Sequence, residues 1–388
     1  MAPAQAQQAR DAVLESDEAL TLEAIDRVNR LITEHNADVR QRRGPPIEPL
    51  IPEATRKFAV FVYRQQDQQW VRDEGRSFVT NEKAAALDYV AQVKRVAGWT
   101  ATTNARERFV LDAQVLPPTL GRLMPLHRPL GDPLPEEWLA RHDEPPQDYA
   151  QYVASRPVRA TRERQTLDVQ PLGEFTATER RIIDTTVEYL GIYFQLPVRL
   201  RQDFAESVIP AEATRRRDDV SATQISTIYV RNQVLKPRLP DDAVGYVALT
   251  GDDLFTGSHE GTVLGEASLA ERVGVWSIHR FGNPEASSEA YHRALRWALH
   301  VAAHETGHLF SLPHCTYFDC SMRGSRRFDE FNRIPMWLCP NCLAKLCYAT
   351  GAKPEKRFRE LIVFGERYRL EREAKFWRES LEAMGTGP

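Results

Sequence analysis

The stretch that decides the fold lies near the C-terminus and begins His304-Glu305-Thr306-Gly307-His308. In a helix, residues four apart lie on one face, so the imidazoles of His304 and His308 can reach one ion. Glu305 is rotated from His304 by about 100° and lies beside the ion, where it can act on a water molecule. His314 supplies a third ligand after the helix ends. Three protein ligands with an open fourth position are typical of a catalytic zinc site.

Two short-spaced thiol pairs follow the last histidine. Cys315 and Cys320 are separated by four residues, and Cys339 and Cys342 by two. Two such pairs separated by a loop are the ligand pattern of a four-thiolate structural zinc. A bare HExxH occurs by chance in unrelated helices, but a thiol pattern that begins on the residue after His314 argues against chance. The segment therefore predicts two zinc ions, one catalytic and one structural.

The run from His304 to Cys342 resembles the signature of the archaemetzincins, a family of metzincin-type zinc peptidases. The family pattern is HExxHxxGxxHC, followed by CxM and, after a spacer, CxxC. The resemblance implies that the three histidines bind the catalytic zinc and that Glu305 is the general base. It also implies that the four cysteines bind a second zinc and that Met322 forms a Met-turn beneath the catalytic metal.

The chain departs from the family pattern at Ser311, where the family has glycine, and in the length of the spacer after Met322. The glycine ends the helix and turns the chain back, because glycine adopts positive φ freely. Serine in the left-handed region costs about 1 kcal/mol or more. We therefore expect either a strained turn or a geometry in which the Ser311 hydroxyl caps a backbone group.

Composition is that of a soluble enzyme. The 388 residues include 51 basic and 54 acidic side chains, a balance that gives no nucleic-acid or membrane-surface signal. The first twenty residues lack the apolar run of a signal peptide, and no apolar stretch is long enough to cross a membrane. All five cysteines follow residue 314, which indicates metal binding in a reducing, cytoplasmic setting. The fifth, Cys347, is expected to be a small buried apolar residue.

The chain divides into three expected parts. Residues 1–116 form an N-terminal accessory region with helices at Asp17–Asn36 and Asn81–Val96 and a strand at Phe58–Tyr63. Residues 117–165 hold too many prolines for regular structure and form a wrapping segment or a linker. Residues 166–388 form the catalytic domain.

Alternating helices and strands fill the catalytic domain. The expected strands are Leu167–Leu172, Pro197–Phe204, Val244–Leu249 and Gly274–His279. The expected helices are Thr176–Phe194, Ser221–Leu235 (favoured over a strand), an active-site helix from Asn283-Pro284 to Phe310, Cys339–Tyr348 and Pro354–Met384. The fold class is therefore α/β (α+β): a metzincin-like core with a twisted mixed sheet, preceded by an N-terminal α/β extension.

The site predicts zinc-dependent hydrolysis of a peptide bond in a peptide or protein substrate. Glu305 takes a proton from the attacking water and passes it to the leaving amine. An extended peptide would pair with the exposed edge of the sheet, for which Gly274–His279 is the candidate. The alternatives are an inactive, zinc-stabilised interaction module and a zinc hydrolase of a non-peptide substrate. Cleavage specificity and oligomeric state stay open.

Several residues near the motif are expected to be structural. Tyr317 and Tyr348 are interpreted as packing residues rather than oxyanion donors, and His300 as a core histidine. Asp319 is interpreted as a turn residue. No cysteine precedes Cys315, so a thiolate from the N-terminal region cannot block the open zinc position. A carboxylate or imidazole from residues 117–148 could block it, but an accessory layer packed away from the cleft is favoured.

Overall fold

The computed structural model describes residues 58–385 except 67–68, 74, 81–82, 104–110, 112, 132, 134–136, 143, 218–219, 258–262 and 326–327. The expected helix Asp17–Asn36 lies outside the described residues. The chain forms two compact units, and each takes part of the proline-rich segment. The first unit contains Met1–Arg108 and Gly131–Glu144, and the second contains Phe109–Leu130 and Pro145–Pro388.

The first unit is a small antiparallel sheet with one main helix. Strand β1 (Phe58–Gln66) pairs with β2 (Gln69–Arg72), β3 (Phe78–Thr80) and β4 (Trp99–Thr103), and the unit has helices α3 (Lys83–Lys94) and α5 (Trp138–Arg141). Val60, Val62 and Ala101 of the sheet pack with Ala86 and Val90 of α3. The run of β-branched and aromatic residues in β1 and the helical spacing of Ala86 and Val90 in α3 explain why both expected elements are confirmed.

The second unit is built on a five-stranded sheet in the order β11-β12-β9-β5-β6. Strands β5, β6, β9 and β12 run parallel, and β11 pairs antiparallel with β12. Their bounds are β5 Thr166–Leu172, β6 Val198–Leu200, β9 Ala243–Thr250, β11 Gly265–Ala267 and β12 Val273–Ser277. A second, three-stranded sheet contains β7 (Thr214–Arg217), β8 (Val220–Ser226) and β10 (Asp253–Phe255). This mixed architecture confirms the expected α/β class.

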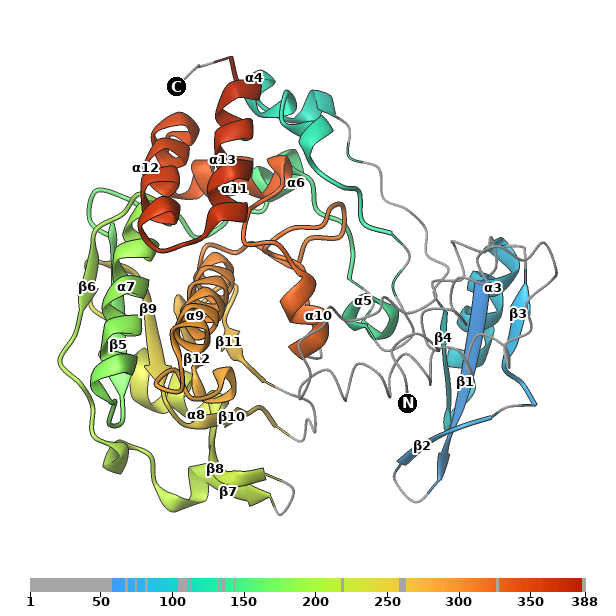
Figure 1. Ribbon diagram of the computed structural model, residues 1–388. Coiled ribbons are helices and arrows are strands. Elements are labelled where there is room, and N and C mark those ends of the chain that lie inside the picture. The colour runs from blue at the N-terminus through green and yellow to red at the C-terminus, as the bar shows by residue number, and fades with distance from the viewer. Residues whose placement is uncertain are drawn as a thin grey trace. The chain divides into compact units, whose positions relative to one another are not determined.

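Two long helices cover one face of the large sheet. Figure 1 shows α9 (Ser288–Leu309) in front of the strands with α7 (Ala177–Phe194) beside it. Helix α7 begins at a capping box between Thr176 and Glu179, the local signal that fixes its start. On the opposite face, a smaller apolar cluster joins the sheet to β8, β10 and a π-helix (Val230–Leu235), which follows α8 (Thr227–Tyr229). None of the described helices is both long and apolar enough to span a membrane.

The C-terminal part adds a helical layer. Its helices are α10 (Phe328–Arg333), α11 (Pro340–Thr350), α12 (Pro354–Arg367) and α13 (Glu371–Ala383). The expectation of one helix from Pro354 to Met384 is therefore wrong, because the chain reverses at Arg369, which has φ +57°. No proline or glycine marks this reversal. Close packing of α12 against α13 stabilises this reversal. The two helices approach closely at Gly365, where an added Cβ would lie 3.1 Å from the Ala374 Cβ.

The interpretation of Ser221–Leu235 as a helix is wrong for its first half. Residues 220–226 form strand β8, which pairs with β7 and β10, and only then does the chain become helical. The Ser226 hydroxyl caps α8 by accepting a hydrogen bond from the Tyr229 amide. The β-branched residues thus determine the strand, and the helical spacing belongs to the turns that follow.

Strand β6 is shorter than the expected Pro197–Phe204. Its ladder with β5 ends at Leu200, although the Phe204 amide still donates to the Pro171 carbonyl at 2.9 Å. Pro171 has no N–H to donate in return, which weakens pairing at this point.

Residues 117–165 contain more regular structure than expected. Helix α4 (Pro118–Gly121) has proline at its first position, where the missing N–H costs nothing. Helix α6 (Tyr149–Ala154) begins at a capping box between Asp148 and Gln151. Residues 145–148 and 156–160, on either side of α6, have no regular secondary structure, and residues 145–160 belong to the second unit.

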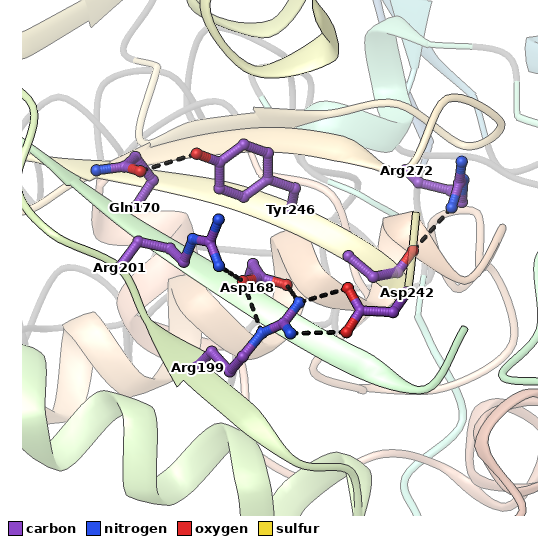
Figure 2. Close-up of polar contacts among 8 residues, drawn as sticks. Asp168, Gln170, Arg199, Arg201, Asp242, Tyr246 and Arg272 are labelled. Carbon is purple, nitrogen blue, oxygen red and sulfur yellow. Dashed lines mark hydrogen bonds and ion pairs between the residues drawn. The ribbon is translucent and has the colours of Figure 1, made fainter. Parts of the chain in front are cut away.

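A buried carboxylate lies on the sheet face opposite α7 and α9. Asp168 of β5 is fully buried and accepts two hydrogen bonds from Arg199, at 3.0 and 2.7 Å. Figure 2 shows Arg199 spanning Asp168 and the exposed Asp242, while Arg201 approaches from the side. Because a buried charge must be paired, the arginines of the edge strand fix β6 against β5.

Candidate metal centres

Helix α9 positions the first two histidines. It begins at Ser287, whose hydroxyl accepts a hydrogen bond from the Ala290 amide, a few residues after the expected Asn283-Pro284 start. Its apolar stripe packs on the sheet and against α7. At its C-terminal end the helix places His304 and His308 one turn apart, as the spacing predicts.

Backbone carbonyls fix the orientation of both rings. His304 Nδ1 lies 2.8 Å from the Ser321 carbonyl oxygen, and His308 Nδ1 lies 2.7 Å from the Leu312 carbonyl oxygen. A carbonyl only accepts, so each Nδ1 carries the proton and each Nε2 presents a lone pair. Burial lowers the pKa of His308 well below its usual value, with the neighbouring histidines adding to the effect. Neutral imidazole with a free Nε2 is the form that binds a metal.

The ring nitrogens gather as a metal site requires. The Nε2 atoms of His304 and His308 are 3.1 Å apart, and the candidate ligand atoms of the three histidines lie within 4.8 Å of one another. With both Nδ1 atoms protonated, the two Nε2 atoms face each other as acceptors, and a cation between them resolves the repulsion. Two nitrogens on one tetrahedral zinc are separated by about 3.3 Å, from bond lengths of about 2.0–2.1 Å. The histidines therefore fit zinc.

Met322 lies directly beneath the motif. A Cβ at Gly307 would come within 2.6 Å of the Met322 sulfur, so the side chain fills the space that the glycine leaves. The Met322 carbonyl accepts a hydrogen bond from the Cys315 amide at 2.7 Å. This backbone bond joins the Met322 turn to the chain that follows His314.

Glu305 is buried between the helix and strand β11. A Cβ at Gly265 would lie 2.6 Å from the Glu305 carboxyl carbon, so this side chain occupies the space beside the glycine. Burial raises the pKa of Glu305 to about 8, and the charge of Glu266 adds to the increase while Arg231 opposes it. Burial in this position therefore disfavours the charged carboxylate.

The strand next to Glu305 is not the expected one. Residues 274–279 belong to β12 and the turn after it, and β12 is paired on both sides, with β9 and with β11. The expectation of an edge at Gly274–His279 is therefore wrong, and the edge near the motif is β11. Its three residues, Gly265–Ala267, carry no strand signal of their own.

The four predicted cysteines form a second, separate cluster. Their sulfur atoms lie within 4.8 Å of one another, and Cys315 Sγ is 3.7 Å from Cys339 Sγ. None of the five cysteines is in a disulfide. Sulfur atoms on one tetrahedral zinc are separated by about 3.8 Å, from bond lengths of about 2.3 Å. Burial raises the pKa of the Cys320 and Cys339 thiols well above their usual value, so these two need a neighbouring cation to become thiolates.

The turn after α9 combines both outcomes expected for Ser311. Ser311 has φ +61°, and the Ser311 amide donates to the His308 carbonyl while the Leu312 amide donates to the Gly307 carbonyl. These two bonds make a Schellman motif with serine in the left-handed position. The hydroxyl also bonds two backbone groups: it donates to the Leu269 carbonyl at 2.6 Å and accepts from the Val158 amide at 3.1 Å.

The neighbouring residues hold mostly structural positions. Tyr348 packs between Tyr149, Tyr152 and Arg159, which favours packing over an oxyanion role. His300 is buried and stacks on Phe331, as expected for a core histidine.

Two further side chains agree with their structural interpretation. Tyr317 is buried, and burial raises its pKa to about 12. Asp319 pairs with Arg323 in a turn.

The sequence did not single out Glu266, a charged residue of β11. Glu266 accepts hydrogen bonds from Arg231, at 2.5 Å, and from the Thr227 hydroxyl. Arg231 lies in the π-helix, a rare conformation that is frequent near functional sites. No local motif marks these residues, because the sheet brings them together from distant positions.

Two solved structures are similar to part of this chain. The archaemetzincin of Methanopyrus kandleri is 20% identical and has a TM-score of 0.39, covering 49% of this chain and 98% of its own. The zinc-dependent peptidase of Methanocorpusculum labreanum is 22% identical with a TM-score of 0.36, covering 46% and 99%.

Sequence comparison gives the stronger relationships. Archaemetzincin-2 of Macaca fascicularis is 29% identical over 268 residues, which cover 59% of this chain and 71% of that protein. Archaemetzincin-1 of Homo sapiens is 26% identical over 262 residues, covering 59% and 52%. Peptidase family M54 matches residues 262–347, the segment that holds both ligand clusters. The chain is therefore a zinc metallopeptidase that is similar to the archaemetzincins and, over residues 262–347, to peptidase family M54.

Proposed function

We propose that the protein hydrolyses peptide bonds with Glu305 as general base and with two zinc ions of different roles. His304, His308 and His314 hold the catalytic ion, and the four clustered cysteines hold the structural one. The 3.1 Å separation of the two histidine Nε2 atoms, both of which present lone pairs, is the observation that carries this proposal. The absence of disulfides among the five cysteines also supports the reducing, cytoplasmic setting predicted from the sequence.

The chain's own residues would move the proton. When bound, zinc lowers the pKa of a water molecule and polarises the substrate carbonyl. Glu305, held between α9 and Gly265, accepts a proton from the attacking water and delivers it to the departing amine. The Ser321 and Leu312 carbonyls hold the two helix histidines in one tautomer throughout.

The substrate would bind along strand β11. This strand is the edge of the large sheet and lies against Glu305, so a peptide paired with it would pass the proton acceptor. Backbone pairing with an exposed edge gives affinity that does not depend on peptide sequence, and side-chain pockets add selectivity. β11 therefore takes the role that the sequence assigned to Gly274–His279.

Replacing Gly265 with alanine should strongly reduce activity. The new methyl group would lie 2.6 Å from the Glu305 carboxylate, which must then move away from its position. Misplacing a catalytic group by about 1 Å can cost about 100-fold in rate, and we expect a loss of that size in kcat/KM. Gly191→Ala is the matched control, because its nearest contacts would be ordinary ones at 3.7 Å. Normal activity in Gly265→Ala would contradict the position given to Glu305.

A peptide-library cleavage assay on zinc-loaded protein tests the function as a whole. Cleavage that disappears with a chelator and returns with zinc is the expected result. A protein that binds zinc but cleaves no peptide would favour the alternatives, an inactive interaction module or a hydrolase of another substrate.

Metal analysis tests the two sites separately. We expect two zinc ions per chain, with at most one thiol reacting in the native protein. That thiol is Cys347, which is half-buried, and burial raises its pKa to about 12. One bound ion, or four reactive thiols, would overturn the two-site assignment.

A further inference from the structure

We infer that the Ser311 hydroxyl is a positioning group that ties residues 145–160 to the hairpin of β11 and β12. Through this tie the segment ahead of the catalytic core would hold the strand against which the substrate lies. The role in substrate binding rests on the proposed function, whereas the tie itself is independent of it.

Ser311 has a strained left-handed backbone conformation, and its hydroxyl contacts two segments that are distant in sequence. Its φ of +61° is one that glycine adopts without strain, but glycine has no hydroxyl. The hydroxyl uses both of its capacities: it donates to the Leu269 carbonyl and accepts from the Val158 amide. These partners are 42 and 153 residues away along the chain, so the contacts join three separate segments at one atom.

Residues 145–160 lie on one side of Ser311 and are hydrogen-bonded to two helices. The buried Tyr152 hydroxyl donates to the Phe310 carbonyl at 2.5 Å, at the end of α9. The Ala160 amide donates to the Ala349 carbonyl at 2.8 Å, at the end of α11. Residues 152–160 are therefore bonded to both helices that flank the ligand clusters, and Val158 lies between the two bonds.

The hairpin of β11 and β12 lies on the other side of Ser311, and its turn is partly exposed. Strand β11 has only three residues, and Leu269, in the turn that follows it, is 46% exposed. Hydrogen bonds from the Ser268 amide to the Val273 carbonyl and from the Ser277 amide to the Leu264 carbonyl close the hairpin. On the side away from Ser311, Lys236 bonds Glu271 and Arg272 bonds the Ala243 carbonyl. Ser311 adds an attachment at Leu269, on the side of residues 145–160. Because Gly265 lies against Glu305, movement of the tip would shift the substrate strand relative to the proton acceptor.

Ser311→Ala and Ser311→Gly separate the tie from the backbone strain. Both variants lose the hydroxyl, and only the glycine variant relieves the positive φ. Hydrogen–deuterium exchange of the amides in residues 264–277 should become faster in both variants at unchanged zinc content. With a fluorogenic peptide taken from the library assay, KM should rise about fivefold, the factor for one net hydrogen bond. The kcat should stay within about twofold, because the zinc ligands and Glu305 are untouched.

Two variants within residues 145–160 complete the test. Ser155→Ala removes a hydroxyl that bonds only the Tyr152 carbonyl, at 2.8 Å, and should leave both exchange and KM unchanged. Tyr152→Phe removes one of the two bonds that support this segment, so it should lower the melting temperature and also speed exchange in residues 264–277, by less than the Ser311 variants do.

Two results would overturn the inference. One is unchanged exchange in residues 264–277 of both Ser311 variants. The other is normal KM and exchange in Ser311→Gly with a defect only in Ser311→Ala, which would assign the effect to strain. If the wild-type protein cleaves no peptide, the proposed function fails, and the exchange measurement still decides whether the tie exists.

Discussion

Replacing Glu305 with glutamine should abolish peptide hydrolysis while both zinc ions stay bound. Glutamine has nearly the same shape and keeps the contact with Gly265, but it cannot accept a proton from water. General base catalysis contributes about 100- to 10,000-fold, and we expect kcat to fall by at least this factor. Steady-state kinetics and metal analysis of the same preparation make the test. Loss of the histidine-bound zinc in this variant would show that Glu305 is a ligand and not a base.

Glu266→Gln is the matched control for this prediction. Glu266 is the neighbouring carboxylate, and it is bonded to Arg231 and Thr227. Its removal should leave substantial activity, because it acts on Glu305 only through charge. Since the Glu266 charge raises the pKa of Glu305, its neutralisation should move the acidic limb of the pH profile to lower pH. Equal loss of activity in both variants would contradict the separate roles.

Replacing Cys339 with serine should remove the structural zinc and destabilise the fold. A structural zinc contributes folding free energy directly, and we expect a loss of about 5 kcal/mol or more. This corresponds to a melting temperature lower by about 10–20 °C for a unit of this size. Cys339 is also the N-cap of α11, and serine is a good N-cap, so the substitution preserves the cap and isolates the metal's contribution. Thermal unfolding and zinc content measure the two effects.

Cys347→Ser is the control that the chain itself provides. Cys347 lies in the same helix but outside the group of four sulfur atoms. Its replacement should leave the zinc content at two and change the melting temperature only slightly. If both cysteine variants unfolded at the same temperature with two zinc ions retained, the four-thiolate site would be refuted.

Local patterns determined what could be predicted from the sequence. The two ligand clusters depend on spacings of a few residues, such as the four positions between His304 and His308, and the structure brings both clusters together as expected. Helix α7 was predictable because its capping box and apolar stripe lie within its own residues. These features need no knowledge of the rest of the chain.

The edge strand could not be predicted because its signal is not local. Gly265–Ala267 has no β-branched or aromatic residue, and it is a strand only because β12 pairs with it. The pairing of Asp168 with Arg199 likewise depends on two strands that are 31 residues apart. The hydroxyl bonds of Ser311 follow from a turn whose partners the sequence does not reveal.

The adjacency of His314 and Cys315 has a thermodynamic consequence. Neighbouring Cα atoms are held about 3.8 Å apart, so the last ligand of one ion and the first ligand of the other cannot move independently. Linkage is reciprocal: if binding of the first ion raises the affinity for the second, binding of the second raises the affinity for the first by the same factor. We therefore expect the two zinc ions to bind cooperatively. When zinc is limiting, each molecule would then hold either two zinc ions or none. A shortage of zinc would lower the number of active molecules, and the kcat of each active molecule would stay the same.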